Sequence, residues 1–369
     1  MADAIIVGAG VVGAAVADAL SEAGLRVTLL DATLPGGGTT AAGMGHIVVM
    51  DDSEAQFQLT SYSRTLLDAL RPELTGSAEY ERTGTLWVAE DAEQLQIVRE
   101  KHAYYSQRGV AVEILDAQAL AEAEPNLRPL AGALRVPDDG VLYPPGLARV
   151  LLDRALKRGC ALRTGVRVER LEAHTVVTQD QRLQADIVVN AAGAAASLLT
   201  PELPIVPRKG HLVITDRYPN FCRHQLVELG YLKSAHTMDA ASVAFNLQPR
   251  RTGQVLIGSS RELVGWDASI NRSIVRRMLQ RALQFTPKLA ALSAIRTWTG
   301  FRPTTPDKLP LIGPWEPQEG VWIAAGHEGL GITTALGTAR LLADMIVGRV
   351  PVLDAGAYSP VRALVAEAA

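Results

Sequence analysis

A glycine-spaced run near the start of the chain could bind a dinucleotide. Gly8-Ala9-Gly10-Val11-Val12-Gly13 follows an apolar strand expected at 4–7 and opens a helix expected at 12–23. In the G-x-G-x-x-G pattern the first glycine permits a tight turn, the second lets the backbone approach a pyrophosphate, and the third allows close helix–strand packing. The N-terminus of the helix favours negative charge. Asp31 ends the next expected strand, 18 residues after Gly13, where it can bind ribose hydroxyls.

The elements that must position this loop form a β-α-β unit, and nucleotide-type segments recur in the middle and at the end of the chain. The segment 210–260 is mostly extended, with alternating apolar and polar residues. We therefore expect an α/β fold with two domains. The first is a discontinuous, Rossmann-like nucleotide domain at 1–75, 140–205 and 298–369, and the second is a β-rich substrate domain at 76–139 and 206–297.

Four further segments carry a resemblance to a known family. They are Thr39-Thr40-Ala41-Ala42-Gly43-Met44-Gly45, Gly165-Val166-Arg167-Val168, Asp186 to Gly193, and Trp298-Thr299-Gly300-Phe301-Arg302-Pro303 continuing to Gly313. Together with the first loop, and in this order, they resemble the glycine oxidase / D-amino-acid oxidase superfamily of FAD enzymes. The resemblance runs nearly end to end and implies an FAD cofactor and a D-amino-acid oxidase-like fold.

A last glycine-rich segment, Ala325-Gly326-His327-Glu328-Gly329-Leu330-Gly331, precedes a helix expected at 332–347. Such a loop can place backbone N–H groups and a positive helix end against the flavin N1–C2=O edge, which would stabilise the reduced anionic cofactor. A simple strand-to-helix turn is the alternative. The cofactor-binding residues expected from all these segments are Gly8, Gly10, Val12, Gly13, Asp31, Thr39, Thr40, Ala42, Gly43, Met44, Gly45, Val168, Ala192, Gly193, Gly300, Arg302, Gly326, His327, Gly329, Leu330, Gly331 and Ile332.

Five residues are candidates for contact with a substrate. The resemblance assigns Arg302 to the substrate carboxylate, which a guanidinium can bind in a bidentate pair. Asn246 stands where glycine oxidase has a tyrosine that assists the carboxylate, so we consider Tyr231 as a replacement, with a packed core tyrosine as the alternative. His46 and His327 lie in loops expected to face the flavin, where they could orient substrate or serve as structural histidines.

The motifs Gly43-Met44-Gly45-His46, 296–313 and 326–331 resemble one subgroup most, the catalytic β subunits of hydroxyproline dehydrogenase, opine oxidase and hydrogen cyanide synthase. This resemblance implies an FAD subunit that oxidises a D-amino or imino acid, with D-hydroxyproline or D-proline as the expected substrate, and passes electrons to redox partner subunits. A glycine-, sarcosine- or opine-type oxidase that reduces O2 to H2O2 is the first alternative. A glycerol-3-phosphate-type dehydrogenase, a flavin-carrying scaffold and an NAD-only dehydrogenase rank below it.

Composition excludes several other classes of protein. The 369 residues include 48% hydrophobic and 20% charged residues, as in ordinary globular chains, and the net charge of -3 argues against a nucleic-acid surface. Cys160 and Cys222 are too few for a cluster of their own, so we expect reduced thiols and no metal site. No apolar run reaches the roughly 20 residues of a membrane span. Because the glycine loop starts soon after Met1, we expect no targeting segment and a cytoplasmic protein, with any membrane association through partners.

Overall fold

The structure is a computed structural model that describes residues 2–74, 76–229 and 241–362. The chain divides into two compact units. Unit 1 comprises Met1–Ala78, Tyr143–Arg208 and Phe301–Ala369, and unit 2 comprises Glu79–Leu142 and Lys209–Gly300. That the first unit binds the cofactor and the second the substrate stays a prediction of the sequence.

Unit 1 is built on a six-stranded sheet in the order β18-β19-β12-β1-β2-β8. All neighbouring pairs are parallel except β18 with β19, which are antiparallel. Unit 1 also contains a small antiparallel sheet in the order β11-β10-β9. The strands are β1 (Ala4–Val7), β2 (Val27–Asp31), β3 (His46–Ile47), β8 (Ala161–Thr164), β9 (Val168–Glu172), β10 (Thr175–Thr178), β11 (Arg182–Gln184), β12 (Ile187–Asn190), β18 (Leu311–Pro314) and β19 (Val321–Ala325).

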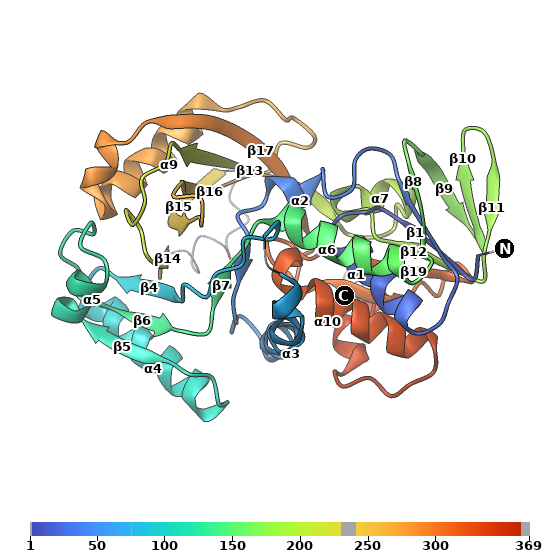
Figure 1. Cartoon of the computed structure of the whole chain (residues 1–369), viewed down its shortest axis with the longest axis horizontal. Coiled ribbons are helices and arrows are strands. Elements are labelled where there is room, and N and C mark those ends of the chain that lie inside the picture. Colours follow the sequence, from blue (N-terminus) through green and yellow to red (C-terminus); the bar gives the residue numbers. More distant parts are fainter. Residues whose placement is uncertain (1, 75, 230–240, 363–369) are drawn as a thin grey trace. The chain divides into compact units, whose positions relative to one another are not determined.

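The helices of unit 1 are α1 (Val11–Glu22), α2 (Thr39–Ala42), α3 (Glu54–Leu70), α6 (Pro144–Lys157), α7 (Ala196–Leu199) and α10 (Gly331–Ile346), with 3-10 turns at Arg71–Glu73, Gly193–Ala195 and Ala355–Tyr358. The small side chains of α1, rich in alanine, let it pack closely against α6 and α10 (Figure 1). Buried strand residues such as Ile5, Val188 and Ile323 form the core of the sheet. The parallel sheet and its β1-α1-β2 start confirm the expected Rossmann-like α/β fold.

Unit 2 is built on an eight-stranded sheet in the order β17-β13-β16-β15-β14-β4-β6-β5. Its strands are β4 (Thr85–Ala89), β5 (Glu113–Asp116), β6 (Gly132–Val136), β13 (Val206–Thr215), β14 (Gln225–Glu228), β15 (Ala241–Pro249), β16 (Val255–Glu262) and β17 (Ala294–Thr304); β7 (Gly140–Val141) is a short strand outside it. Its helices are α4 (Ala92–Gln107), α5 (Ala117–Ala123) and α9 (Arg272–Phe285), with a 3-10 turn at Pro287–Ala291. Strands β13 and β17 connect the two units along the chain.

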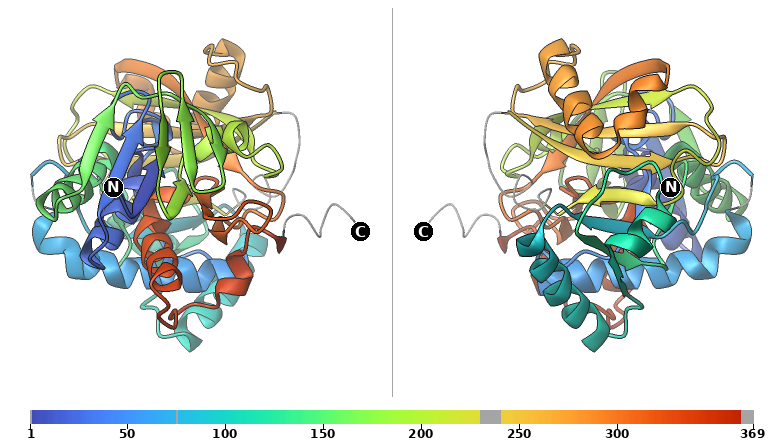
Figure 2. Two further views of the ribbon diagram at one scale, coloured as in Figure 1. Left: turned by 90° about the vertical axis from the view of Figure 1, so that its right-hand side faces the viewer. Right: turned by 90° about the vertical axis from the view of Figure 1, so that its left-hand side faces the viewer.

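Helix α9 covers one face of this sheet, as the right-hand view of Figure 2 shows. Asn271 caps the helix, because its side-chain oxygen accepts hydrogen bonds from the N–H groups of Ser273 and Ile274. Phe285 stacks on Phe245 of β15 with 4.3 Å between ring centroids. The β-rich character expected for 206–297 is therefore present in β13 to β17. Among the described residues, no helix combines the length and apolar character needed to cross a membrane.

Candidate functional site

The first glycine loop is a tight turn between β1 and α1. Gly8 has φ of 103°, in the left-handed region that favours glycine, and a Cβ on it would lie 2.5 Å from the carbonyl oxygen of Ala191. A Cβ on Gly13 would lie 1.8 Å from the carbonyl oxygen of Gly8, so no side chain fits there. Gly10 caps α1 without a side-chain hydrogen bond. The helix therefore begins without a capping side chain of its own, which fits a diphosphate.

Asp31 is held at the end of β2 beside this loop. Its Oδ2 accepts a hydrogen bond of 2.7 Å from the backbone N–H of Ala9, and its Oδ1 accepts from the N–H and hydroxyl of Thr33. The N–H of Val166 donates to the backbone oxygen of Asp31 at 2.9 Å. This bond brings the segment that leads to Val168 to the same edge of the sheet. The carboxylate is thus placed where a ribose would follow the diphosphate.

The small-residue segment 39–46 connects the loop to two later parts of the chain. Residues 39–42 form the short helix α2, which the sequence did not indicate, because one helical turn leaves no periodic signal. The hydroxyl of Thr40 accepts from the N–H of Val11 at 3.0 Å, and the hydroxyl of Thr39 donates to the backbone oxygen of Phe301 at 2.8 Å. Ala42 and Met44 are half-buried in this segment. A Cβ on Gly43 would lie 2.7 Å from Cδ1 of Ile332.

The turn after β12 covers the glycine loop. The N–H of Ala191 donates to the backbone oxygen of Val7 at 2.9 Å, and the N–H of Ala192 donates to the side-chain oxygen of Asn190 at 3.3 Å. Gly193 has φ of 59°, and a Cβ on it would lie 3.9 Å from the hydroxyl oxygen of Thr39. The segments 186–193 and 39–45, both of which the sequence assigned to the cofactor, are therefore neighbours.

The second glycine loop places the start of α10 beside the start of α1. A Cβ on Gly331 would lie 3.9 Å from Cγ2 of Val12. Leu330 caps α10 without a side-chain hydrogen bond, so this helix also begins with bare backbone. The hydroxyl of Thr333 donates to the backbone oxygen of His46 at 2.8 Å. Two positive helix ends therefore meet the small-residue segment, as a long anionic cofactor requires.

His327 is buried inside this loop. Its Nε2 lies 3.0 Å from the hydroxyl of Thr338 on α10. Burial lowers the pKa of His327 to about 3, so the imidazole is neutral at neutral pH. A neutral, hydrogen-bonded ring can hold the loop in shape, but it cannot supply a proton from an imidazolium. His46, the other predicted histidine, is half-buried at the start of β3.

Arg302 lies on β17 next to the second glycine loop, and 18% of its side chain is exposed. Its Nε is 4.0 Å from Oε2 of Glu328, and a Cβ on Gly329 would be 3.6 Å from the same nitrogen. Gly326 has φ of 80° in the same loop. A cation at this position, partly accessible and beside the predicted cofactor segments, can bind an anionic group of a substrate.

Asn246, another predicted substrate residue, belongs to unit 2. Asn246 is on β15 in unit 2, where its side-chain oxygen accepts a hydrogen bond from Nε2 of Gln225. It points away from α9, because the neighbours on either side of it, Phe245 and Leu247, pack in the core under that helix. Tyr231 lies outside the described residues. Gly300 is the last residue of unit 2, on β17.

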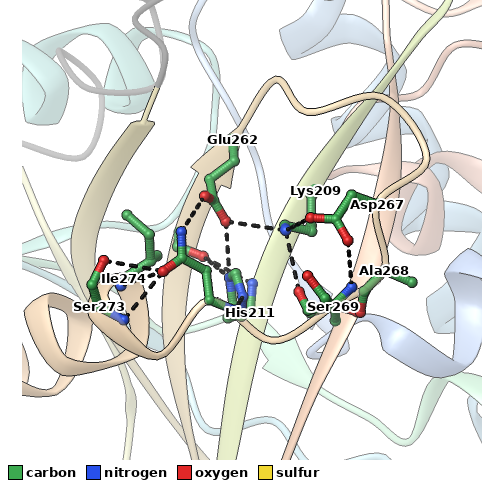
Figure 3. A network of polar contacts seen from close by, with 11 residues as sticks. Lys209, His211, Glu262, Asp267, Ala268, Ser269, Ser273 and Ile274 are labelled. Carbon is green, nitrogen blue, oxygen red and sulfur yellow. Dashed lines mark hydrogen bonds and ion pairs between the residues drawn. The ribbon is translucent and has the colours of Figure 1, made fainter.

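Unit 2 also contains a buried polar network that the sequence did not suggest (Figure 3). Nζ of Lys209 donates to Asp267 at 3.3 Å and lies 3.6 Å from Oε2 of Glu262. Nε2 of His211 accepts from the backbone N–H of Asn271 at 3.0 Å, so its proton is on Nδ1, which faces Glu262 at 3.6 Å. The network ties the loop after β16 and the cap of α9 to β13.

Glu328 and Arg208 were also missed by sequence reasoning. Both belong to unit 1, as Arg302 does. Glu328 forms one ion pair with Arg208 at 3.6 Å and another with Arg302 at 4.0 Å. For Glu328 the sequence did contain a signal, because an acid stands inside a glycine-rich loop where small residues are otherwise required. Arg208 offered no local signal, because it is an arginine on a strand.

Comparison with known proteins identifies the family. The FAD dependent oxidoreductase (DAO) family matches residues 3–345 of the chain. The chain is 31% identical to glycine oxidase of Pseudomonas aeruginosa over 96% of this chain and 98% of that protein. It is 30% identical to hydrogen cyanide synthase subunit HcnC of the same species over 100% and 99%. It is 34% identical to D-amino acid dehydrogenase of Xanthobacter autotrophicus over 82% and 73%.

A solved structure agrees with these relatives. Glycine oxidase from Geobacillus kaustophilus superposes with a TM-score of 0.87 at 26% identity, over 97% of this chain and 98% of that one. The chain therefore belongs to the DAO family of FAD-dependent oxidoreductases, and its cofactor is FAD. The glycine turns, the two bare helix starts and Asp31 fit that cofactor.

Proposed function

We propose that this FAD-dependent oxidoreductase is a dehydrogenase that oxidises a D-amino or imino acid, with D-hydroxyproline or D-proline as the preferred substrate. The observation that carries the proposal is the position of Arg302, partly exposed beside the second glycine loop. A guanidinium there can bind the substrate carboxylate and present the neighbouring Cα–N bond to the cofactor.

FAD, when bound, supplies the hydride acceptor at N5. The Cα–H bond breaks and its hydrogen leaves with both electrons, while the lone pair of the neutral amine nitrogen forms the Cα=N bond of a protonated imine. This product becomes the neutral imine when its N–H proton passes to water. Water then hydrolyses an open-chain imine to a keto acid, whereas a ring substrate gives a cyclic imine. No general base is needed if the amine binds in its neutral form. A neutral His327 is consistent with this, because it neither takes up nor releases a proton near pH 7.

Asn246, Tyr231 and His46 are proposed contributors to substrate orientation. Asn246 supplies an amide where a tyrosine hydroxyl stands in glycine oxidase, and an amide can accept a hydrogen bond from a substrate hydroxyl. The preference for hydroxyproline over glycine rests on the resemblance of the motifs at 43–46, 296–313 and 326–331 to the hydroxyproline dehydrogenase subgroup. Partner subunits that accept the electrons are part of the proposal, supported by the name of the relative HcnC, which is a subunit.

The experiment is anaerobic mixing of the FAD-loaded protein with one candidate at a time, namely D-hydroxyproline, D-proline, glycine, sarcosine, an opine or glycerol-3-phosphate. Loss of the oxidised flavin absorbance with a D-imino acid, followed by slow recovery in air, is the expected result. Fast recovery in air would identify the second candidate, an oxidase, which the likeness to glycine oxidase favours. Bleaching by glycerol-3-phosphate alone would overturn the proposal.

A further inference from the structure

Glu328 joins two arginines in unit 1. Its Oε1 lies 3.6 Å from Nη1 of Arg208, and its Oε2 lies 4.0 Å from Nε of Arg302. The hydroxyl of Thr304 also donates to Oε1, at 3.4 Å. The carboxylate therefore bridges a completely buried cation and the cation that we assign to the substrate.

The backbone of Glu328 is held in an unfavourable conformation. Its φ of 48° is in the left-handed region, which is unfavourable for a residue with a Cβ. The conformation persists because the N–H of Glu328 donates to the backbone oxygen of Pro303 at 2.9 Å, next to Arg302 in the chain. Gly329 follows directly and lies against Arg302. A glycine would relieve the strain at 328, so the carboxylate itself explains a glutamate there.

The three side chains act as one charged group. Only 1% of Arg208, 13% of Glu328 and 18% of Arg302 is exposed, so water screens their charges weakly. Counted over these three side chains, two positive charges and one negative charge give a net charge of +1. Without the Glu328 carboxylate, both arginines lose a negative charge that they share, and a second carboxylate of a ligand can take its place.

We propose that Glu328 is a specificity-determining residue that matches the Arg302 site to substrates with a single carboxylate and disfavours dicarboxylates. This inference rests on the proposed function, in which Arg302 binds the substrate carboxylate. Glu328 also limits how far the Arg302 guanidinium can turn, because Nε faces it and the two Nη groups lie on the other side of the guanidinium carbon. The discrimination is a difference between two affinities, so it is measured as a ratio.

The test uses the FAD-loaded full chain and two probes that cannot be oxidised, benzoate with one carboxylate and phthalate with two. The dissociation constant of each is measured from the change in flavin absorbance on titration. For Glu328→Gln, which keeps the shape and removes the charge, we expect the ratio of phthalate to benzoate affinity to rise roughly tenfold. Glu328→Asp and the surface control Glu319→Gln, whose side chain is 87% exposed, should keep the wild-type ratio.

An unchanged ratio in Glu328→Gln would overturn the inference, whatever happens to the absolute affinities. If that variant fails to fold or to hold FAD, the double variant Arg208→Gln/Glu328→Gln restores the net charge of +1 and should show the wild-type ratio. A raised ratio in the double variant would also overturn it. Should the wild-type protein bind neither probe while retaining FAD, the proposed function itself fails and the inference falls with it.

Discussion

The buried histidine makes the stability of this protein depend on pH in one definite window. Burial lowers the pKa of His327 from 6.5 to about 3. Below pH 6.5 the unfolded chain binds a proton at this position that the folded chain does not, so folding becomes less favourable as the pH falls. Above pH 6.5 the ring is neutral in both states and contributes no pH dependence.

The size of the effect follows from the same two values. Each pH unit below 6.5 costs about 1.4 kcal/mol of unfolding free energy, until the pH approaches 3. At pH 5.0 the loss attributable to His327 is therefore about 2 kcal/mol. This is a large share of the stability of a typical domain.

The assay compares urea unfolding, followed by tryptophan fluorescence, at pH 7.5 and pH 5.0 for wild type and His327→Gln. Glutamine can still hydrogen-bond to Thr338 but does not titrate, so the variant should lose about 2 kcal/mol less than wild type between the two pH values. Any packing cost of the substitution is present at both pH values and cancels. His174→Gln serves as the control, because the His174 side chain is 43% exposed. Equal pH dependence of wild type and His327→Gln would refute the reasoning.

Three further predictions concern binding and stability. Arg302→Ala should raise the substrate KM by roughly 30-fold or more with FAD retained, because a charge-assisted contact is lost. Arg302→Lys should recover part of the lost affinity. A normal KM of Arg302→Ala in steady-state kinetics would remove the carboxylate role. Asp31→Ala should weaken FAD binding by roughly tenfold, whereas Asp31→Glu should weaken it less. Fluorescence titration of the apoprotein with FAD measures the dissociation constant. An unchanged dissociation constant in Asp31→Ala would contradict the ribose role. Lys209→Met should destabilise the protein by about 3 kcal/mol, because it removes a cation from buried Glu262, and Lys209→Met/Glu262→Gln should be less destabilised. Urea unfolding measures this last difference, and equal stability of the two variants would show that the buried pair is not coupled.

Local patterns were enough to predict the elements that carry the expected cofactor residues. The glycine spacing of 8–13, an apolar strand before it and an acid at the end of the next strand are all determined by neighbours in the chain, and the structure forms β1, α1 and β2 there. The strand-to-glycine turn at 187–193 and the helix start at 331 follow the same logic. In each case glycine supplies a backbone shape that other residues avoid, so its position in the sequence carries structural information.

Sequence patterns did not predict elements that are too short to show a periodic repeat, or contacts that leave no periodic signal in the sequence. Helix α2 has only four residues, less than the repeat needed to recognise an amphipathic helix. The network around Lys209 combines β13, β16 and the loop before α9. Each of its members looks like an ordinary surface residue in the sequence, and only the fold brings them together, with Lys209, His211 and Glu262 buried and Asp267 exposed.

The sequence by itself determined the glycine-rich turns and the family, because these depend on residues close together in the chain. The substrate role of Arg302 stays a prediction. Only the tertiary structure decided which charges meet. Arg208 and Glu328 are 120 positions apart in the sequence, and Thr39 and Phe301 are 262 apart. The neutrality of His327 arises from its burial. Periodicity records that a residue will be buried but not beside which partner, and electrostatic energies depend on that partner and on the loss of water around it.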